Sequence, residues 1–303
     1  MQLISKFNYL YQSTNNTGLK YSNIYKILLA MQMHFLQHKN SLIQYTIWGH
    51  GPKCLLCLHG FGQDGSSFNF LEKELASQFT CIAIDIPFHG NTQWQEGINI
   101  HPAEFWEVLA TIAAKHHPTN FIQDPVSILA YSLGGRLALH LLQLYPTQIK
   151  QLVLLAPDGL KVNFWYRLGT QTQWGNALFK YTMQYPNWFI AIVTVGRKTG
   201  ILNKSITKFV HAHMDDPTIR TQLYQRWTAL RHFAPKQKKI KQLIQQYQIP
   251  VNILYGSYDR IIVPKRSKYL QQQNNLVSIT IIEGGHDLLK PRFATAIGAL
   301  FSQ

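Results

Sequence analysis

Short apolar runs alternate with amphipathic stretches along most of this chain, and this alternation limits the folds open to it more than any other feature. The runs have the length of buried strands and cover residues 54–58, 81–86, 126–131, 152–156, 251–255 and 277–282. The stretches with helical periodicity include residues 66–78, 103–115, 136–144 and 264–272. Strands that are apolar on both faces and joined by helices form a mostly parallel sheet covered on both sides. The sequence therefore predicts an α/β fold, preceded by an antiparallel hairpin over residues 33–48.

One interval interrupts this alternation. More than 90 residues separate the run that ends at Ala156 from the run that begins at Val251, which is too long for a simple crossover. Aromatic residues recur there at helical spacing, so we predict an inserted helical cap at residues 158–235. The predicted α/β core then comprises residues 33–157 and 236–303.

The N-terminal region has a different character. Residues 1–32 are rich in Asn, Tyr, Ser and Gln and have no clean period, which predicts a poorly ordered extension. Polar residues interrupt every candidate signal-peptide core, and no apolar stretch reaches the roughly eighteen residues that cross a bilayer. We therefore expect a cytoplasmic protein without a transmembrane segment. The cysteines at positions 54, 57 and 81 form no even disulfide set, and their place in strands predicts buried core thiols.

The chain is strongly basic, with 29 Lys and Arg against 14 Asp and Glu. From Arg197 to Lys241 there are 11 basic residues and only two acidic ones, Asp215 and Asp216. No nucleic-acid-binding motif accompanies this stretch, so we expect no nucleic acid as a partner and predict a solvated basic helical face. The alternative is that it attracts an anionic substrate, an acidic carrier protein or an anionic membrane surface.

The segment "SILAYSLGGR" runs from a predicted strand directly into Ser132. A sharp strand-to-helix turn crowds the residues two before and two after the serine, and Ala130 and Gly134 are small enough for it. The pattern matches a nucleophile elbow with Ala in the first Gly position. Because ligands of parallel sheets bind beyond the carboxyl ends of the strands, Ser132 is a candidate nucleophile.

A serine hydroxyl is a weak nucleophile, so it needs a base and an acid that orients the base. Asp259 follows the strand that ends at Tyr255, and His286 follows the strand that ends at Ile282. The order Ser, Asp, His is the one expected for a nucleophile elbow. We predict that Ser132, Asp259 and His286 form a catalytic triad.

Acyl transfer also needs hydrogen-bond donors for the developing oxyanion. The amide of Leu133 directly follows the nucleophile, and the amide of Phe61 lies between two glycines in "LHGFG" after a predicted strand. We predict that these two amides form the oxyanion hole, and that His59 is a structural, hydrogen-bonded residue.

Together these motifs resemble those of the α/β-hydrolase superfamily with a cap. The resemblance is carried by residues 59–62, 85–90 and 130–135 with Asp259 and His286, and spans the chain from residue 33 to its C-terminus. Phe88 departs from the family's D-x-P-G-H-G motif, where the first glycine would stand, and this affects only the local geometry of the loop. The resemblance implies that Asp85 is structural and shapes the loop under the site.

Other assignments were weighed against this triad. Asp158 follows a predicted strand at a position from which some members of the superfamily recruit the acid, but we favour Asp259. Asp287 projects from the position next to His286 and is a poor orienter. The remaining histidines, including the pairs His116–His117 and His211/His213, lack metal-ligand partners at convincing spacing, so we expect neither a metal nor a cofactor.

A serine nucleophile argues against the alkyl-enzyme chemistry of epoxide hydrolases and haloalkane dehalogenases. We expect hydrolysis of a carboxylic ester or thioester of a small-molecule acyl substrate through an acyl-enzyme on Ser132. The alternatives are a C–C bond hydrolase or menaquinone-pathway-type lyase acting on an anionic substrate, and an inactive binding protein of the same fold.

Overall fold

The computed structural model describes residues 32–302 apart from 118–123, 162–163, 201, 203–206, 208–209 and 212–213. The predicted N-terminal extension lies outside the described residues except for Gln32, which already belongs to the first strand.

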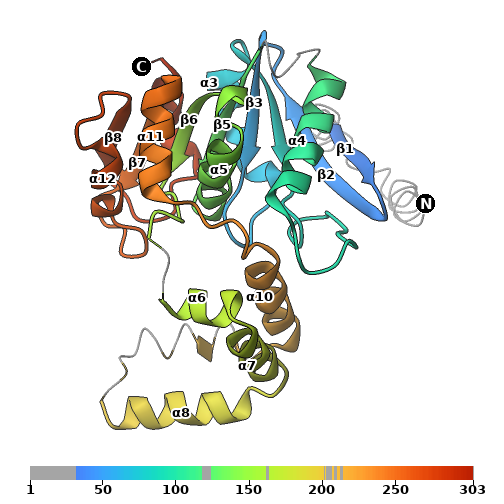
Figure 1. The fold of residues 1–303 in the computed structure, drawn as a ribbon, viewed down its shortest axis with the longest axis vertical. Coiled ribbons are helices and arrows are strands. Elements are labelled where there is room, and N and C mark those ends of the chain that lie inside the picture. Colours follow the sequence, from blue (N-terminus) through green and yellow to red (C-terminus); the bar gives the residue numbers. More distant parts are fainter. Residues whose placement is uncertain are drawn as a thin grey trace, which may run out of the picture.

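An eight-stranded sheet forms the centre of the molecule (Figure 1), in the order β1-β2-β4-β3-β5-β6-β7-β8. The strands are β1 Gln32–His38, β2 Ser41–Trp48, β3 Lys53–Leu58, β4 Phe79–Ile84, β5 Val126–Tyr131, β6 Ile149–Leu155, β7 Val251–Gly256 and β8 Val277–Ile282. β1 and β2 form an antiparallel hairpin, and β2 pairs antiparallel with β4. The other six strands, β3 to β8, run parallel to one another. The predicted α/β fold with a mostly parallel sheet is confirmed.

Helices cover both faces of the sheet. The α-helices of the sheet region are α3 Glu72–Leu75, α4 Pro102–His116, α5 Leu133–Leu144, α11 Gln237–Tyr247, α12 Lys268–Gln271 and α13 Ala294–Gly298. Short 3-10 helices cover Gly65–Leu71, Pro146–Gln148, Pro264–Arg266, Pro291–Phe293 and Ala299–Phe301. α4, α5 and α11 lie side by side on the face turned to the viewer in Figure 1, and α3 packs against α13.

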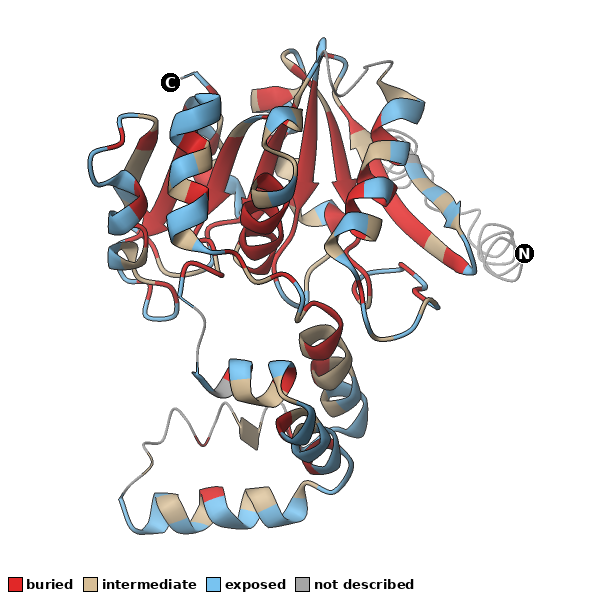
Figure 2. Ribbon diagram, viewed as in Figure 1, coloured by how far each residue is buried: buried red, intermediate tan, exposed pale blue. Residues whose placement is uncertain are grey.

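The central parallel strands form the core because most of their residues are apolar. All six residues of β5 are buried, as are all six of β7, since helices cover both sides. Figure 2 shows this core as a continuous red band through the sheet. The thiols of Cys54, Cys57 and Cys81 lie in it as free cysteines, as predicted. Burial raises the pKa of Cys54 to about 12, which keeps that thiol protonated and inert.

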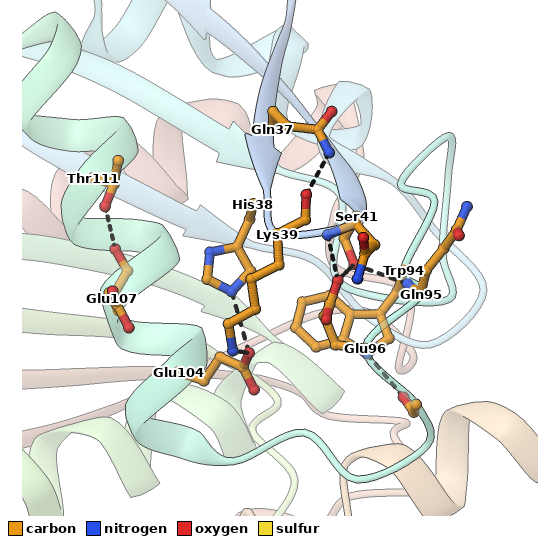
Figure 3. A network of polar contacts seen from close by, with 12 residues as sticks. Gln37, His38, Lys39, Ser41, Trp94, Gln95, Glu96, Glu104, Glu107 and Thr111 are labelled. Carbon is orange, nitrogen blue, oxygen red and sulfur yellow. Dashed lines mark hydrogen bonds and ion pairs between the residues drawn. The ribbon is translucent and has the colours of Figure 1, made fainter.

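A polar network fixes the β1–β2 turn to the rest of the molecule (Figure 3). Glu104 at the start of α4 accepts hydrogen bonds from Lys39 Nζ at 2.5 Å and from His38 Nε2 at 3.2 Å. Glu96, in the loop before α4, accepts one from Ser41 Oγ at 3.1 Å. The hairpin at the sheet edge is therefore held to α4 and to the loop before it.

Between β6 and α11 the chain leaves the sheet and forms a separate group of helices at the lower end of the molecule in Figure 1. They are α6 Phe164–Gln171, α7 Gln173–Gln184, α8 Asn187–Lys198 and α10 Pro217–Ala229. Met183, Met214 and Leu223 form a small apolar cluster of their own there. We call the segment from α6 to α10 the helical insertion. Among the residues that the structure describes, no helix has the length and apolar character needed to span a bilayer.

Candidate active site

Ser132 occupies a strained turn between β5 and α5. Its φ of 49° and ψ of −110° lie outside the regions that L residues usually adopt, which costs on the order of 1–3 kcal/mol. Hydrogen bonds hold the turn in place, from Ser132 N to Leu155 O at 2.9 Å and from Gly134 N to His59 O at 3.1 Å. A Cβ atom on Gly134 would lie only 2.0 Å from Leu58 O, so this turn requires glycine there.

The structure brings the three predicted side chains together. Ser132 Oγ lies 3.0 Å from His286 Nε2, and His286 Nδ1 lies 2.7 Å from Asp259 Oδ2. When Nδ1 carries the ring proton and donates a hydrogen bond to the carboxylate, Nε2 keeps a lone pair that can accept the serine O–H proton. The geometry is therefore that of a serine whose hydroxyl is within reach of an oriented base.

The Asp259 carboxylate is fixed from two sides. Its side chain is fully buried, and Oδ1 accepts hydrogen bonds from Ile261 N at 2.7 Å and Ile262 N at 2.9 Å. Because Oδ1 is held by backbone amides, Oδ2 faces His286 in one orientation. This arrangement follows from the turn that ends β7, as the position of Asp259 in the sequence predicts.

Tyr131 also supports the site, although its sequence position did not predict this role. Its hydroxyl donates to the main-chain carbonyl of His286 at 3.0 Å, and the two rings lie 5.5 Å apart between centroids. The contact connects the end of β5 to the loop that carries the base. Tyr131 occupies a variable position of the elbow motif, so the spacing contained no signal for it.

The loop after β3 adopts the shape that its glycines allow. Gly62 has a φ of +75°, in the left-handed region, and follows Phe61 directly. His59 Nδ1 donates to Gly60 O at 2.8 Å, and its Nε2 accepts from Ile86 N at 3.0 Å. Both ring nitrogens are used, so the structure places His59 in the hydrogen-bonded position that was predicted. Leu133 is the first residue of α5, where backbone amides lack acceptors within the helix.

The two competing acids have other partners. Asp158 forms an ion pair with the buried guanidinium of Arg136, and its Oδ1 accepts from Gly159 N at 2.7 Å. Asp287 forms an exposed ion pair with Lys290 at 2.5 Å. Neither carboxylate forms a hydrogen bond with His286 among the described residues.

Asp85 shapes the loop between β4 and α4. Its buried carboxylate accepts from Gly65 N at 2.7 Å and from Asn91 N at 2.8 Å, which joins two loops under the site. Phe88, the residue that departs from the motif, has a φ of 65° and so takes up the left-handed conformation of the glycine it replaces. At this position the chain thus holds a non-glycine residue in the left-handed conformation.

Arg226 reaches this region from α10. Its Nε donates to Phe88 O at 2.9 Å, and its guanidinium carbon lies 5.3 Å from the centroid of the Phe61 ring. Desolvation lowers the pKa of the guanidinium, which nevertheless stays charged at neutral pH. No carboxylate pairs with it among the described residues. In the sequence, Arg226 stands out only as part of a basic stretch, because nothing in the spacing connects it to Phe61.

His89 lies buried beside Arg226. Its Nδ1 donates to Pro87 O at 3.0 Å, and its Nε2 has no hydrogen-bond partner among the described residues. Its ring lies edge-on to those of His59 and Phe61, at 5.2 and 5.8 Å between centroids. Desolvation, aided by the charges of His59 and Arg226, lowers its pKa to about 3, so the ring is neutral at neutral pH.

Comparison with known proteins identifies a family and several relatives. The family described as "Serine aminopeptidase, S33" matches residues 50–290. A pimeloyl-[acyl-carrier protein] methyl ester esterase of Pseudoalteromonas atlantica is 28% identical over 245 residues, which are 76% of this chain and 86% of that protein.

Two solved structures have a similar fold. An esterase from Thermogutta terrifontis is 16% identical with a TM-score of 0.62, covering 89% of this chain and 98% of its own. A thioesterase domain from the curacin biosynthetic pathway is 18% identical with a TM-score of 0.58, covering 90% of this chain and all of its own.

Proposed function

The chain belongs to the serine aminopeptidase S33 family of α/β hydrolases, and from this premise we propose that it cleaves a carboxylic ester or thioester through an acyl-enzyme on Ser132. The observation that carries the proposal is the hydrogen-bonded series from Ser132 Oγ through His286 to Asp259. We further propose that residues 158–235 act as a cap over the substrate.

In the proposed reaction, Ser132 Oγ attacks the substrate carbonyl carbon while His286 Nε2 takes the hydroxyl proton. The amides of Phe61 and Leu133 stabilise the oxyanion, and Asp259 stabilises the imidazolium that forms. When the tetrahedral intermediate collapses, the alcohol or thiol leaves with the proton from His286. Water then attacks the acyl-enzyme by the same steps, which releases the acid and restores the serine.

The proposed substrate is a small acyl compound. The relative from Pseudoalteromonas atlantica is named for a methyl ester on an acyl carrier protein, and the curacin-pathway domain is named a thioesterase. By analogy, an acyl group on an acidic carrier protein is a candidate substrate here, because the basic stretch of this chain would attract such a carrier.

The test is labelling with a fluorophosphonate combined with the Ser132→Ala variant. We expect an adduct on Ser132, and a fall in kcat of about 10⁴- to 10⁶-fold for Ser132→Ala with p-nitrophenyl esters. Ser66→Ala, at an exposed serine outside the site, is the control and should keep both activity and labelling. The screen should include acyl thioesters and an aminoacyl p-nitroanilide.

The result also decides between an enzyme and an inactive binding protein. If folded protein forms no adduct at Ser132, the chain is a binding protein of this fold. If Ser132→Ala lowers the melting temperature as severely as it lowers turnover, the serine is structural.

Arg226 favours a second candidate, which is a C–C bond hydrolase or lyase acting on an anionic substrate. A desolvated guanidinium that has no acidic partner within the described part of the chain, and that lies over the Phe61 ring, could bind a carboxylate near the scissile bond. For Arg226→Gln we expect kcat/KM to fall about 10- to 100-fold for the monomethyl ester of a dicarboxylic acid. The neutral methyl ester of equal length should be affected far less.

Arg167→Gln, at an exposed arginine on α6, is the matched control. Equal losses for both esters in Arg226→Gln would contradict a role in charge recognition. Increasing the ionic strength should also lower kcat/KM for the charged ester, and leave the neutral ester unchanged.

A further inference from the structure

Seven apolar side chains stand out on α7, on α8 and at the residue directly after α7, because they face solvent. They are Trp174, Leu178, Tyr181, Tyr185, Trp188, Ile192 and Val195, and each is between 37% and 63% exposed. We call this set the exposed stripe. Its members recur at alternating intervals of four and three residues, which places those within each helix along one side of it.

The exposed stripe is not the surface that holds the helical insertion together. Met183 of α7 and Val193 of α8 are buried, and Phe179 and Phe189 pack against the cluster around Met214. Each helix thus has one apolar side that packs inward and a second apolar side that meets water. Monomeric proteins rarely expose so many large apolar groups together unless the surface binds something.

The charge of the same segment indicates what it binds. Between Asp158 and Asp215 the sequence contains seven Lys and Arg and no acidic residue at all. Of these, Arg197 and Lys198 are exposed in the last turn of α8, and Lys180 is exposed on α7. Figures 1 and 2 place α8 at the end of the molecule farthest from the sheet, with exposed residues along much of its length.

We propose that the exposed stripe docks the helical insertion onto an anionic phospholipid surface. Helices that lie in the membrane interface combine an apolar side with Lys and Arg, and Trp and Tyr are favoured at that depth. Basic residues beside the apolar side bind the lipid head groups. The inference does not depend on the proposed hydrolase activity, because docking requires no turnover.

Two other occupants fit the observations less well. A second copy of this chain would bring two basic, acid-free segments together and would leave their charges unpaired. An acidic carrier protein would satisfy the charges, but it does not require a row of exposed Trp, Tyr and Ile side chains. A lipid surface accounts for both features at once.

The experiment is cosedimentation of the full-length protein with vesicles of phosphatidylcholine alone, and with vesicles that also contain phosphatidylglycerol. We expect at least about tenfold stronger binding to the anionic vesicles, weakened by salt. The double variant Tyr181→Ser with Ile192→Ser should lose about tenfold or more of that binding. The matched control is Leu144→Ser with Tyr247→Ser, an exposed leucine and tyrosine on α5 and α11, and it should bind as wild type.

Several outcomes would overturn the proposal. One is equal binding to both vesicle types, and another is unchanged binding by the stripe variant. A third is a wild-type protein that binds no vesicles but forms a dimer in sedimentation velocity, when the stripe variant is a monomer. Stripe-dependent binding of an acidic acyl carrier protein, without vesicle binding, would assign the exposed stripe to that carrier instead.

Two measurements keep this result separate from the proposed hydrolysis. Ser132→Ala should bind vesicles like the wild type, and the stripe variant should hydrolyse a water-soluble p-nitrophenyl ester like the wild type. Failure of the hydrolase proposal therefore leaves the vesicle result standing, and the reverse also holds.

Discussion

Two neutral imidazoles lie buried beside the loop of Phe61. Desolvation lowers the pKa of His59 to about 4 and that of His89 to about 3, from an ordinary value of 6.5. In the unfolded chain both rings take up a proton as the pH falls through 6.5, whereas in the folded protein they stay neutral until much lower pH. The unfolded state then binds more protons, so acidification favours unfolding.

We therefore expect the free energy of unfolding to fall as the pH drops from 6.5 to 5, by up to about 1.4 kcal/mol per pH unit for each histidine. His89→Gln should reduce this fall by about 1–2 kcal/mol, because one buried titrating group is lost. Urea unfolding at several pH values measures how the free energy of unfolding depends on pH in both proteins. His50→Gln, at an exposed histidine, should keep the wild-type pH dependence, and an unchanged dependence in His89→Gln would contradict the explanation.

Residue by residue, the sequence was most informative where chain order constrains the chemistry. Asp259 and His286 could be selected because each directly follows a predicted strand and the order matches the elbow. Tyr131, Arg226 and the pairing of Asp158 with Arg136 could not, because these contacts depend on side-chain directions and on how α6 and α10 meet the sheet. Local patterns contain no information on such distant contacts.

At the scale of elements, the connection from β5 to α5 depends on close approach of two backbones. α5 begins directly against the end of β3, and Gly134 is the point of contact. This contact holds the helix N-terminus, and with it the amide of Leu133, in one position relative to the Phe61 loop. Packing therefore requires glycine at this turn, whatever the role of Ser132.

Gly134→Ala is expected to destabilise the fold by about 2–5 kcal/mol, because the added Cβ atom clashes with the backbone of β3. The variant should also lose activity. Gly285→Ala is the control, because a Cβ atom there meets nothing within 4 Å and its φ is ordinary. Thermal melting of both variants provides the comparison. A Gly134→Ala protein as stable as Gly285→Ala would contradict the requirement for glycine at this turn.

The strands could be predicted from their apolar runs even where burial is incomplete. The run at 126–131 coincides with the fully buried β5, and the run at 277–282 coincides with the edge strand β8, in which only Val277 is buried. The helix predicted over 66–78 is instead a 3-10 helix followed by the single turn α3. The segment starts close to β4, because a Cβ atom on Gly65 would lie 2.6 Å from Ala83 O.

At the scale of the whole molecule, the helical insertion and the sheet have separate apolar clusters. The cluster around Met183 belongs to the insertion, whereas Ala229, Leu230 and Phe233 pack into the main core. The outgoing and returning chains also meet, because Gln237 Nε2 donates to Leu160 O. These features predict that most of the insertion can be removed without unfolding the sheet.

We expect that replacing residues 164–227 with a flexible linker of about eight residues leaves a cooperatively folding core. Calorimetry should show one transition, and the fluorophosphonate should still label Ser132. Discrimination among long acyl esters should be lost, because the proposed substrate cover is gone. Complete failure to fold would show that the two clusters are interdependent, and a second, shorter replacement of α7 and α8 alone would then locate the dependence.

β6 and β7 are neighbours in the sheet, so the chain segment between them leaves and re-enters the sheet at adjacent strands. Because β6 pairs directly with β7, from Leu152 opposite Val251 to Leu155 opposite Leu254, this pairing does not depend on the length of the segment between the two strands. Related proteins can therefore differ in what this segment recognises while keeping the same central sheet.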